Sequence, residues 1–156
     1  MFREMRRKDK QRPEEDAIRM FEETHYGVLS VLGDDGYPYG VPLNHVYLDG
    51  KLYFHCALKG HKVDAIMKEP KVSYCVIGSE TSVPEKRTTI YKSAICFGKA
   101  RIVDDPDEKM RALVKVIEKH SPGFHEEGMK EIDQKWIVTN VIAIDIEHMT
   151  AKGTAE

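Results

Sequence analysis

The chain has 156 residues, of which 41% are hydrophobic and 32% are charged, and its formal net charge at pH 7 is −2. This composition fits one globular domain over residues 1–156, with too many apolar residues for a disordered chain and too few for a membrane protein. The net charge gives no general attraction to nucleic acid, and no apolar run reaches the roughly 20 residues of a membrane-spanning helix. We therefore expect neither nucleic acid nor a membrane among the partners.

The first twelve residues are strongly basic and lack the apolar centre of a secretory signal. We expect residues 1–12 to form a flexible or arm-like start, and the protein to be cytoplasmic. The basic side chains of this segment are more typical of a solvated surface than of a nucleic-acid contact. They are Arg3, Arg6, Arg7, Lys8, Lys10 and Arg12.

Three cysteines, Cys56, Cys75 and Cys96, are spread along the chain. Their odd number and wide separation argue against a disulfide framework and against the paired spacing of zinc sites. Free thiols in a reducing compartment are expected, and no metal site is predicted.

The first half of the chain predicts a helix followed by three strands. Pro13 and the acids after it suit the first turn of a helix, in which Ile18 and Phe21 would face the core. Residues 26–32 and 38–47 read as two strands joined by a turn of glycine and aspartate. The Asp49-Gly50 pair then predicts a tight hairpin into residues 52–54. The expected arrangement of the three strands is a meander.

The second half alternates strands with helices. A short helix is predicted around residues 63–67, a strand over 71–77, a polar loop or flap over 78–87, and a long strand over 88–103 with a bend or bulge at Gly98. Asp105 and Pro106 predict the start of a helix. Residues 121–130 read as a loop, and the shared parity of apolar residues over 136–146 predicts a half-buried strand. About six strands with peripheral helices predict a mainly β barrel or strongly curled sheet.

The most informative stretch runs from Tyr53 to Lys62, from a strand end through a glycine turn into a helix start. Free N–H groups and the helix dipole favour an anion there, and the side chains of His61 and Lys62 add positive charge. These residues alone also fit an ordinary turn glycine followed by solvated side chains, which is the commoner case.

Five segments in order resemble the pyridoxamine 5′-phosphate oxidase-like flavoproteins, and in particular their nitroimidazole-resistance branch. The segments are YGVLS at 26–30, GYPYGVPLN at 36–44, FHCA at 54–57, GHK at 60–62 and YKSAICFGKA at 91–100. The resemblance extends from about residue 6 to residue 152. It implies a six-stranded antiparallel FMN-binding split barrel, usually a homodimer with its flavins at the subunit interface.

The resemblance also implies which residues bind FMN. Gly60, His61 and Lys62 correspond to the phosphate-binding segment, and the strand ending at Asn44 corresponds to the one along the flavin ring. His55 is a candidate catalytic residue, although a histidine at a strand end is as often structural. The full set of implied cofactor-binding residues is Pro42, Leu43, Asn44, His55, Cys56, Ala57, Gly60, His61, Lys62, Tyr91 and Ser93.

The implied function is that of an FMN-dependent oxidoreductase, which transfers electrons or hydride to a small molecule such as a nitroaromatic or nitroimidazole compound. The absence of a Gly-rich dinucleotide fingerprint means that NADH or NADPH, if either is the donor, would bind transiently. The end of the chain lacks the arginine-bearing segment of true pyridoxamine phosphate oxidases, so vitamin B6 oxidation is not expected. Two alternatives remain: a non-catalytic flavin-binding redox sensor or carrier, and a split barrel that binds haem or a deazaflavin-like cofactor.

Overall fold

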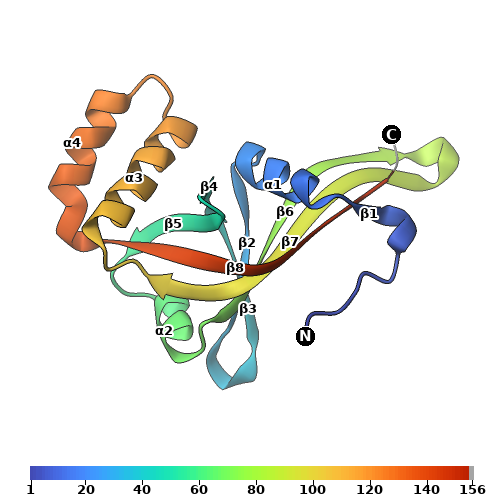
Figure 1. The fold of residues 1–156 in the computed structure, drawn as a ribbon, viewed down its shortest axis with the longest axis horizontal. Helices are drawn as coiled ribbons and strands as arrows, with labels where there is room; N and C mark the ends of the chain where they lie inside the picture. Colours follow the sequence, from blue (N-terminus) through green and yellow to red (C-terminus); the bar gives the residue numbers. More distant parts are fainter. Residues whose placement is uncertain (155–156) are drawn as a thin grey trace.

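A computed structural model describes residues 1–154, and the last two residues of the predicted domain, 155–156, lie outside the described residues. One antiparallel sheet forms the body of the molecule, with helices at its edges and ends (Figure 1). The strands are β1 (Gln11–Arg12), β2 (Tyr26–Leu32), β3 (Pro38–Asn44), β4 (Val46–Leu48), β5 (Lys51–Ala57), β6 (Lys71–Val83), β7 (Thr88–Ile102) and β8 (Thr139–Gly153). The helices are α1 (Glu14–Glu23), α2 (His61–Lys68), α3 (Pro106–His120) and α4 (His125–Lys135).

The sheet has the order β3-β2-β6-β7-β8-β5-β4, and β1 pairs with β8. The mainly β fold with peripheral helices is therefore confirmed. The number of strands in residues 1–154 is eight rather than six, because the short pieces β1 and β4 pair as well. The sheet curls without closing, since β3 and β4 lie at its two ends and share no pairing within the described chain.

The chain crosses from one end of the sheet to the other at His45. Asn44 pairs with Tyr26 of β2, whereas Val46 pairs with Tyr53 of β5. The predicted meander of three strands is therefore wrong, and residues 38–47 are two strands. Alternating apolar residues predict extended backbone on both sides of His45, but they do not show to which neighbour each piece pairs.

A buried histidine ring stabilises this crossing. Nδ1 of His45 lies 2.8 Å from the hydroxyl of Tyr74, and Nε2 lies 2.9 Å from the carbonyl oxygen of Phe21 in α1. The side chain is 1% exposed, and burial lowers the pKa of His45 to about 4. Because both ring nitrogens have partners, the polar ring is accommodated in the core, and it fixes the corner between β3 and β4.

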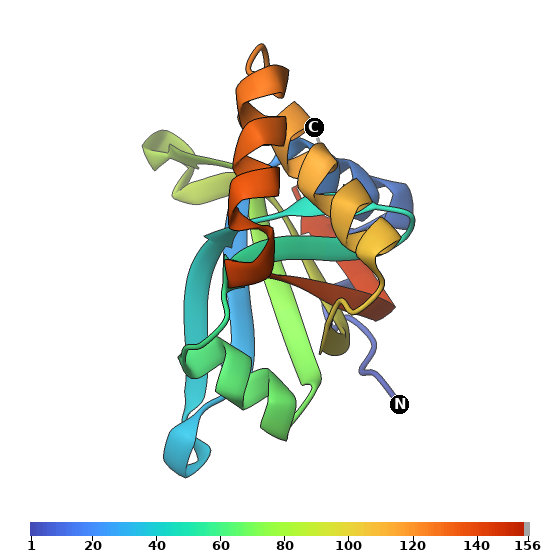
Figure 2. The same ribbon diagram turned by 90° about the vertical axis from the view of Figure 1, so that its left-hand side faces the viewer.

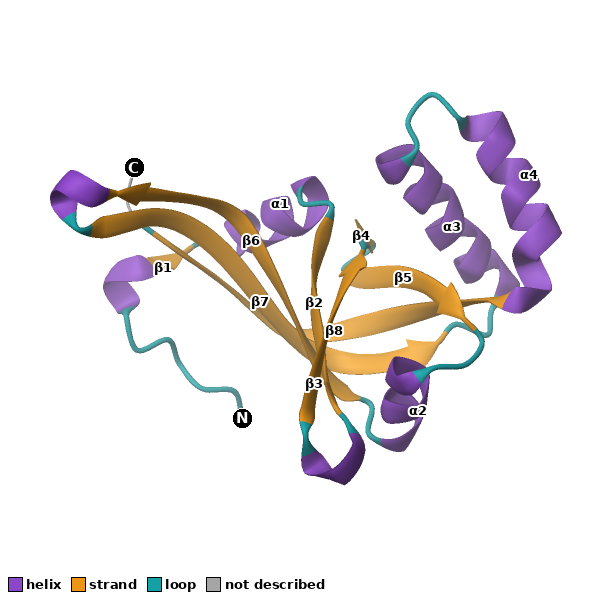
Figure 3. Cartoon of the chain, turned by 180° about the vertical axis from the view of Figure 1, so that it is seen from behind, coloured by secondary structure: helices purple, strands orange, loops and turns teal. Residues whose placement is uncertain are grey.

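The predicted loop over residues 78–87 is also wrong. Strands β6 and β7 stay paired as far as Val83 and Thr88, so that a long hairpin projects from the sheet (Figure 3). Its side chains are exposed apart from a half-buried Val83, so no alternation of apolar and polar residues marks it as a strand. The expected irregularity at Gly98 is confirmed: the β7–β8 register shifts there, and a Cβ atom would clash with the backbone of Asp145.

The helix after Pro13 is confirmed as α1, which buries Ala17, Met20 and Phe21 while Ile18 is half-buried. The helix after Asp105 is confirmed as α3. Its N-terminus is capped by the Asp105 side chain, which accepts a hydrogen bond from the backbone N–H of Asp107.

Within residues 1–154, no helix combines the length and the apolar character needed to cross a membrane.

Helix α4 occupies much of the segment that was predicted to be a loop. Gly128, which reads as a turn signal, lies inside α4, where a Cβ atom would come within 2.7 Å of Ile117 in α3. The glycine therefore allows the two helices to pack closely. Residues 136–138 form a short 3-10 turn, and β8 begins only at Thr139. The paired helices α3 and α4 project from one end of the sheet (Figure 2).

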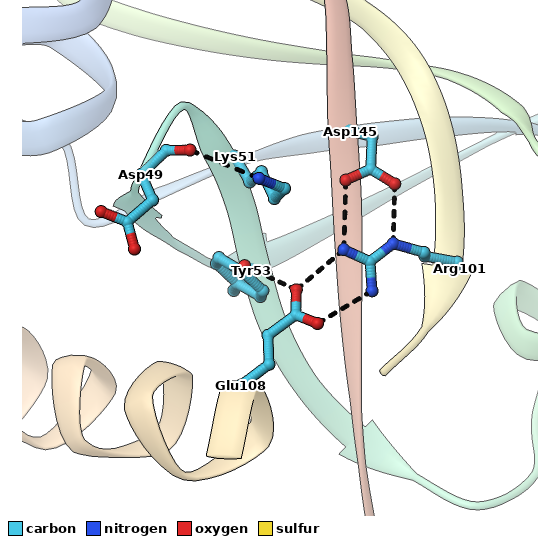
Figure 4. Close-up of polar contacts among 6 residues, drawn as sticks. All are labelled: Asp49, Lys51, Tyr53, Arg101, Glu108 and Asp145. Carbon is cyan, nitrogen blue, oxygen red and sulfur yellow. Dashed lines mark hydrogen bonds and ion pairs between the residues drawn. The ribbon is translucent and has the colours of Figure 1, made fainter. Parts of the chain in front are cut away.

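An ionic network attaches α3 to the sheet (Figure 4). The guanidinium group of Arg101 on β7 donates to Glu108 on α3 and to Asp145 on β8, at 2.7–3.1 Å. The hydroxyl of Tyr53 on β5 donates to Glu108 at 2.8 Å. The hydrogen bonds from Arg101 lower the pKa of Glu108. Three strands therefore hold the first turn of α3 in place.

Candidate functional site

The eleven predicted cofactor-binding residues lie on four elements. Three are at the end of β3, three at the end of β5, three at the start of α2, and two on β7. The start of α2 lies near the end of β5, and the ends of β3 and β5 line one cavity, whereas the pair on β7 lies apart from them.

The start of α2 has the backbone geometry of an anion site. Gly60 precedes the helix with φ of 151° and ψ of 168°, a conformation that side-chain-bearing residues rarely adopt. The N–H of Asp64 donates to the Gly60 carbonyl at 3.0 Å, which closes the first helical turn. No side chain caps the helix, so the backbone N–H groups of residues 61–63 are available to an anion.

The imidazole of His61 is held in place by the β2–β3 hairpin. Its ring stacks on Tyr39 of β3, with centroids 4.1 Å apart and planes 23° from parallel. Nε2 lies 3.9 Å from a carboxylate oxygen of Asp34, in the turn between the two strands. The contact fixes the first residue of α2 against β3.

Lys62 extends towards the end of β5. Burial raises the pKa of the Cys56 thiol, and the nearby Lys62 ammonium opposes that rise. Lys62 is half-buried, and no hydrogen-bond acceptor or carboxylate in residues 1–154 pairs with its ammonium group. A half-buried cation without a partner is suited to binding an anionic ligand.

Asn44 and His55, from the ends of β3 and β5, line one cavity of about 360 Å³. Side chains of α3 and α4 complete it, among them His120 and Trp136. His55 is exposed at the mouth of the cavity, and partial desolvation by the surrounding protein lowers its pKa. The Glu131 carboxylate opposes this shift, and the Lys135 ammonium adds to it. His55 is therefore a neutral imidazole near pH 7, with one ring nitrogen able to donate and the other able to accept.

Leu43 and Ala57 occupy less polar surroundings. The Leu43 carbonyl oxygen lies 3.0 Å from the hydroxyl of Tyr74, and the Leu43 side chain packs against the main core. Ala57 is exposed at the last pairing of β5 with β8, opposite Thr139.

Tyr91 and Ser93 lie on the long β6–β7 hairpin and do not line the cavity. The backbone of Tyr91 is paired with Thr154, and Ser93 pairs with Ile77 and Lys152. One face of the sheet, called the outer face here, carries a row of cross-strand neighbours: Ile95, Cys75, Val28 and Pro42. Ser93 is two residues from Ile95 along β7, so its side chain points to the same face. Pro42 and Ser93 therefore share a face but are separated by β2 and β6.

The outer face is unusually apolar for a surface. Its exposed side chains include Tyr26 at 69%, Val28 at 41%, Ile77 at 68%, Ile95 at 39% and Phe97 at 39%. Near its edge the ring of Phe2 stacks on His148, with centroids 4.8 Å apart, and lies 5.5 Å from Phe97. Exposed apolar surface of this extent is typical of an interaction site.

Sequence reasoning did not identify the contribution of α3 and α4. His120, Glu131, Lys135 and Trp136 reach the cavity only because the two helices fold back over the end of the sheet. No sequence spacing relates them to Asn44 or His55. The three cysteines are free thiols as expected, and the described residues contain no cluster of three or more His, Cys, Asp or Glu that could hold a metal ion.

Comparison of the whole fold with solved structures gives three informative matches. A conserved hypothetical protein, Rv2991, from Mycobacterium tuberculosis is 20% identical, with a TM-score of 0.82 over 96% of this chain and 90% of the other. A proposed 5-nitroimidazole antibiotic resistance protein from Bacteroides thetaiotaomicron is 19% identical, with a TM-score of 0.72 over 90% and 83%. A FAD-binding protein from Mesorhizobium loti is 20% identical, with a TM-score of 0.67 over 94% and 98%.

The TM-scores of 0.82, 0.72 and 0.67 establish a shared fold. No curated protein matches the sequence. The sequence profile described as pyridoxamine 5′-phosphate oxidase matches residues 13–153, which is most of the chain and includes every predicted site residue. The chain therefore belongs to the pyridoxamine 5′-phosphate oxidase-like family.

Proposed function

We propose that this protein is an FMN-dependent oxidoreductase that transfers electrons or hydride to a small-molecule acceptor. The observation that carries the proposal is the unpaired ammonium group of Lys62, a half-buried residue beside the uncapped start of α2. Both features favour a dianionic phosphate, which FMN carries at the end of its ribityl chain.

The residues present fit FMN in their chemistry. The phosphate would be held by the N–H groups after Gly60, by Lys62 and by His61, whose ring is fixed by Tyr39. Asn44 and His55, at the ends of β3 and β5, would offer hydrogen bonds to the polar edge of a flavin ring. When bound, FMN would supply the capacity to accept a hydride and to return two electrons.

A second copy of the chain would complete the site. The exposed apolar side chains on the outer face, with Tyr26 and Ile77 the most exposed, would be buried by a homodimer. Pro42 and Ser93 lie on that face, so a partner packed against it would contact the neighbourhood of β3. Size-exclusion chromatography with light scattering measures the oligomeric state, and a monomer at high concentration would contradict this part of the proposal.

His55 is the proposed catalytic residue. It lies at the end of β5 next to the predicted ring site, and as a neutral imidazole it can donate a hydrogen bond to the acceptor or to the flavin. The similarity in fold to a proposed 5-nitroimidazole resistance protein makes nitroaromatic compounds the first acceptors to assay. NADH and NADPH are the first donors to assay.

The test begins with the absorbance spectrum of the purified protein and with titrations of FMN, FAD and riboflavin into protein stripped of cofactor. The proposal expects flavin absorbance on purification and a preference for FMN over riboflavin, because only FMN carries the phosphate. Under anaerobic conditions the donor should bleach the flavin, and a nitroaromatic acceptor should restore its colour. Protein that takes up no FMN would refute the proposal, and bound flavin that no acceptor reoxidises would favour the sensor or carrier.

A further inference from the structure

The cavity beneath the α3–α4 hairpin has a composition typical of a small-molecule site. Apolar side chains of α3 and α4 line it together with Trp136, and three of its polar side chains are Asn44, His55 and His120. Its volume of about 360 Å³ falls in the range of pockets that enclose small organic ligands. The apolar walls favour an aromatic or aliphatic body, and the polar groups can orient it.

The hydrogen bond of His120 fixes the tautomer of its ring. Nε2 lies 2.9 Å from the carbonyl oxygen of His45. A carbonyl oxygen can only accept, so Nε2 carries the proton and Nδ1 of the neutral ring is an acceptor. Burial lowers the pKa of His120. Nδ1 has no hydrogen-bond partner among residues 1–154, although the ring of His25 packs edge-on with centroids 5.5 Å apart.

The charged groups around the cavity already have partners. Lys119 donates to the carbonyl oxygens of Phe21 and His45, both at 3.2 Å. Lys135 is paired with Glu131 at 2.6 Å, and both side chains are largely exposed. The cavity therefore offers an uncharged ligand two neutral imidazoles, and one of them has a fixed acceptor atom.

We propose that this cavity is the substrate pocket of the flavin site, and that it binds an uncharged aromatic compound whose O–H or N–H group donates a hydrogen bond to Nδ1 of His120. This inference rests on the proposed function, because Asn44 and His55 lie both in the cavity and on the surface assigned to the flavin ring. His120 is then a specificity-determining residue that sequence patterns did not identify.

The only tryptophan of the chain, Trp136, lines the cavity and provides the assay. A nitroaromatic ligand quenches indole fluorescence on contact, so titration of the purified flavoprotein reports occupancy without turnover. The matched probes are meta-nitrobenzyl alcohol and its methyl ether, which differ in the hydrogen-bond donor. The alcohol should bind about three- to tenfold more tightly, the value of one hydrogen bond.

Variants of His120 test the role of its Nδ1 atom, and a variant of His125 serves as the control. His120→Ala should remove the preference for the alcohol. His120→Asn should retain part of it, because an amide can donate to the His45 carbonyl and still accept from the ligand. His125→Ala is the matched control, because His125 is an exposed residue of α4 outside the cavity, and the preference should be unchanged. An equal preference in wild type and His120→Ala would overturn the inference.

A cavity-filling variant separates this inference from the proposed function. Val116→Phe adds volume to the cavity wall and should abolish the saturable quenching while FMN occupancy, read from absorbance, is unchanged. In the wild type, ligand binding should also shift the flavin absorbance band. Saturable quenching with no such shift would overturn the inference, and so would loss of FMN in Val116→Phe, because the cavity would then belong to the flavin site itself. Neither result would contradict FMN binding by the wild type. Failure of the wild type to bind FMN would instead refute the proposed function.

Discussion

Removal of the Lys62 ammonium tests the phosphate site most directly. A charge-assisted hydrogen bond contributes about 1.5–3 kcal/mol, and the lower half of that range applies because Lys62 is only half-buried and partly screened by water. Lys62→Ala should therefore weaken FMN binding by about 10- to 40-fold. The same substitution should leave riboflavin binding nearly unchanged, because riboflavin carries no phosphate.

The measurement is a titration of flavin fluorescence into cofactor-free protein, wild type and variant, with FMN and with riboflavin. Lys68→Ala is the matched control, because Lys68 is exposed in the last turn of the same helix, where the dipole has the opposite sign. An equal loss of FMN and riboflavin affinity would show that Lys62 supports the fold rather than the phosphate. Unchanged FMN affinity would refute the assignment of the site.

Three further predictions concern catalysis, stability and pH. His55→Ala should lower acceptor turnover by about 100-fold, with a melting temperature close to that of the wild type, and the reverse pattern would assign His55 a structural role. Glu108→Ala should cost about 1–3 kcal/mol of unfolding free energy in urea denaturation, because Tyr53 and Arg101 lose their acceptor, and Glu108→Gln should cost less. The folded pKa of His45, about 4, lies below the ordinary value of 6.5, so the stability present above pH 6.5 should fall as pH drops to about 4. The loss should approach 3 kcal/mol, and His45→Gln should flatten that dependence.

The regular elements with a buried face could be predicted from the sequence, because burial leaves a periodic pattern. Helices α1 and α3 were predicted from proline and acidic residues at their starts, and each buries a stripe that sequence spacing indicates. The β6–β7 hairpin beyond Ile77 has no such pattern because nearly all of its side chains are exposed. The hairpin is extended by backbone hydrogen bonds, and these bonds do not depend on which side chains the residues carry.

The proposed phosphate site could be located from the sequence because its residues are local. Gly60, His61 and Lys62 are consecutive, and the change from strand to helix that exposes the backbone N–H groups occurs within a few residues. The cavity was not predictable, since its walls come from β3, β5, α3, α4 and the turn after α4. Trp136 was interpreted as part of a strand, whereas its position in a 3-10 turn brings it to the cavity.

The crossing at His45 contacts both the strand assigned to the flavin and the wall of the cavity. Its ring is buried against Tyr74 and Phe21, while its carbonyl oxygen accepts hydrogen bonds from Lys119 and His120 of α3. The residue before it, Asn44, is the last residue of the strand assigned to the flavin ring. The same residue therefore follows the end of β3 and, through its carbonyl oxygen, fixes which nitrogen of His120 carries the proton. Substitution of His45 should accordingly perturb the cavity and the flavin site together, whereas substitution of Lys62 should affect the flavin site alone.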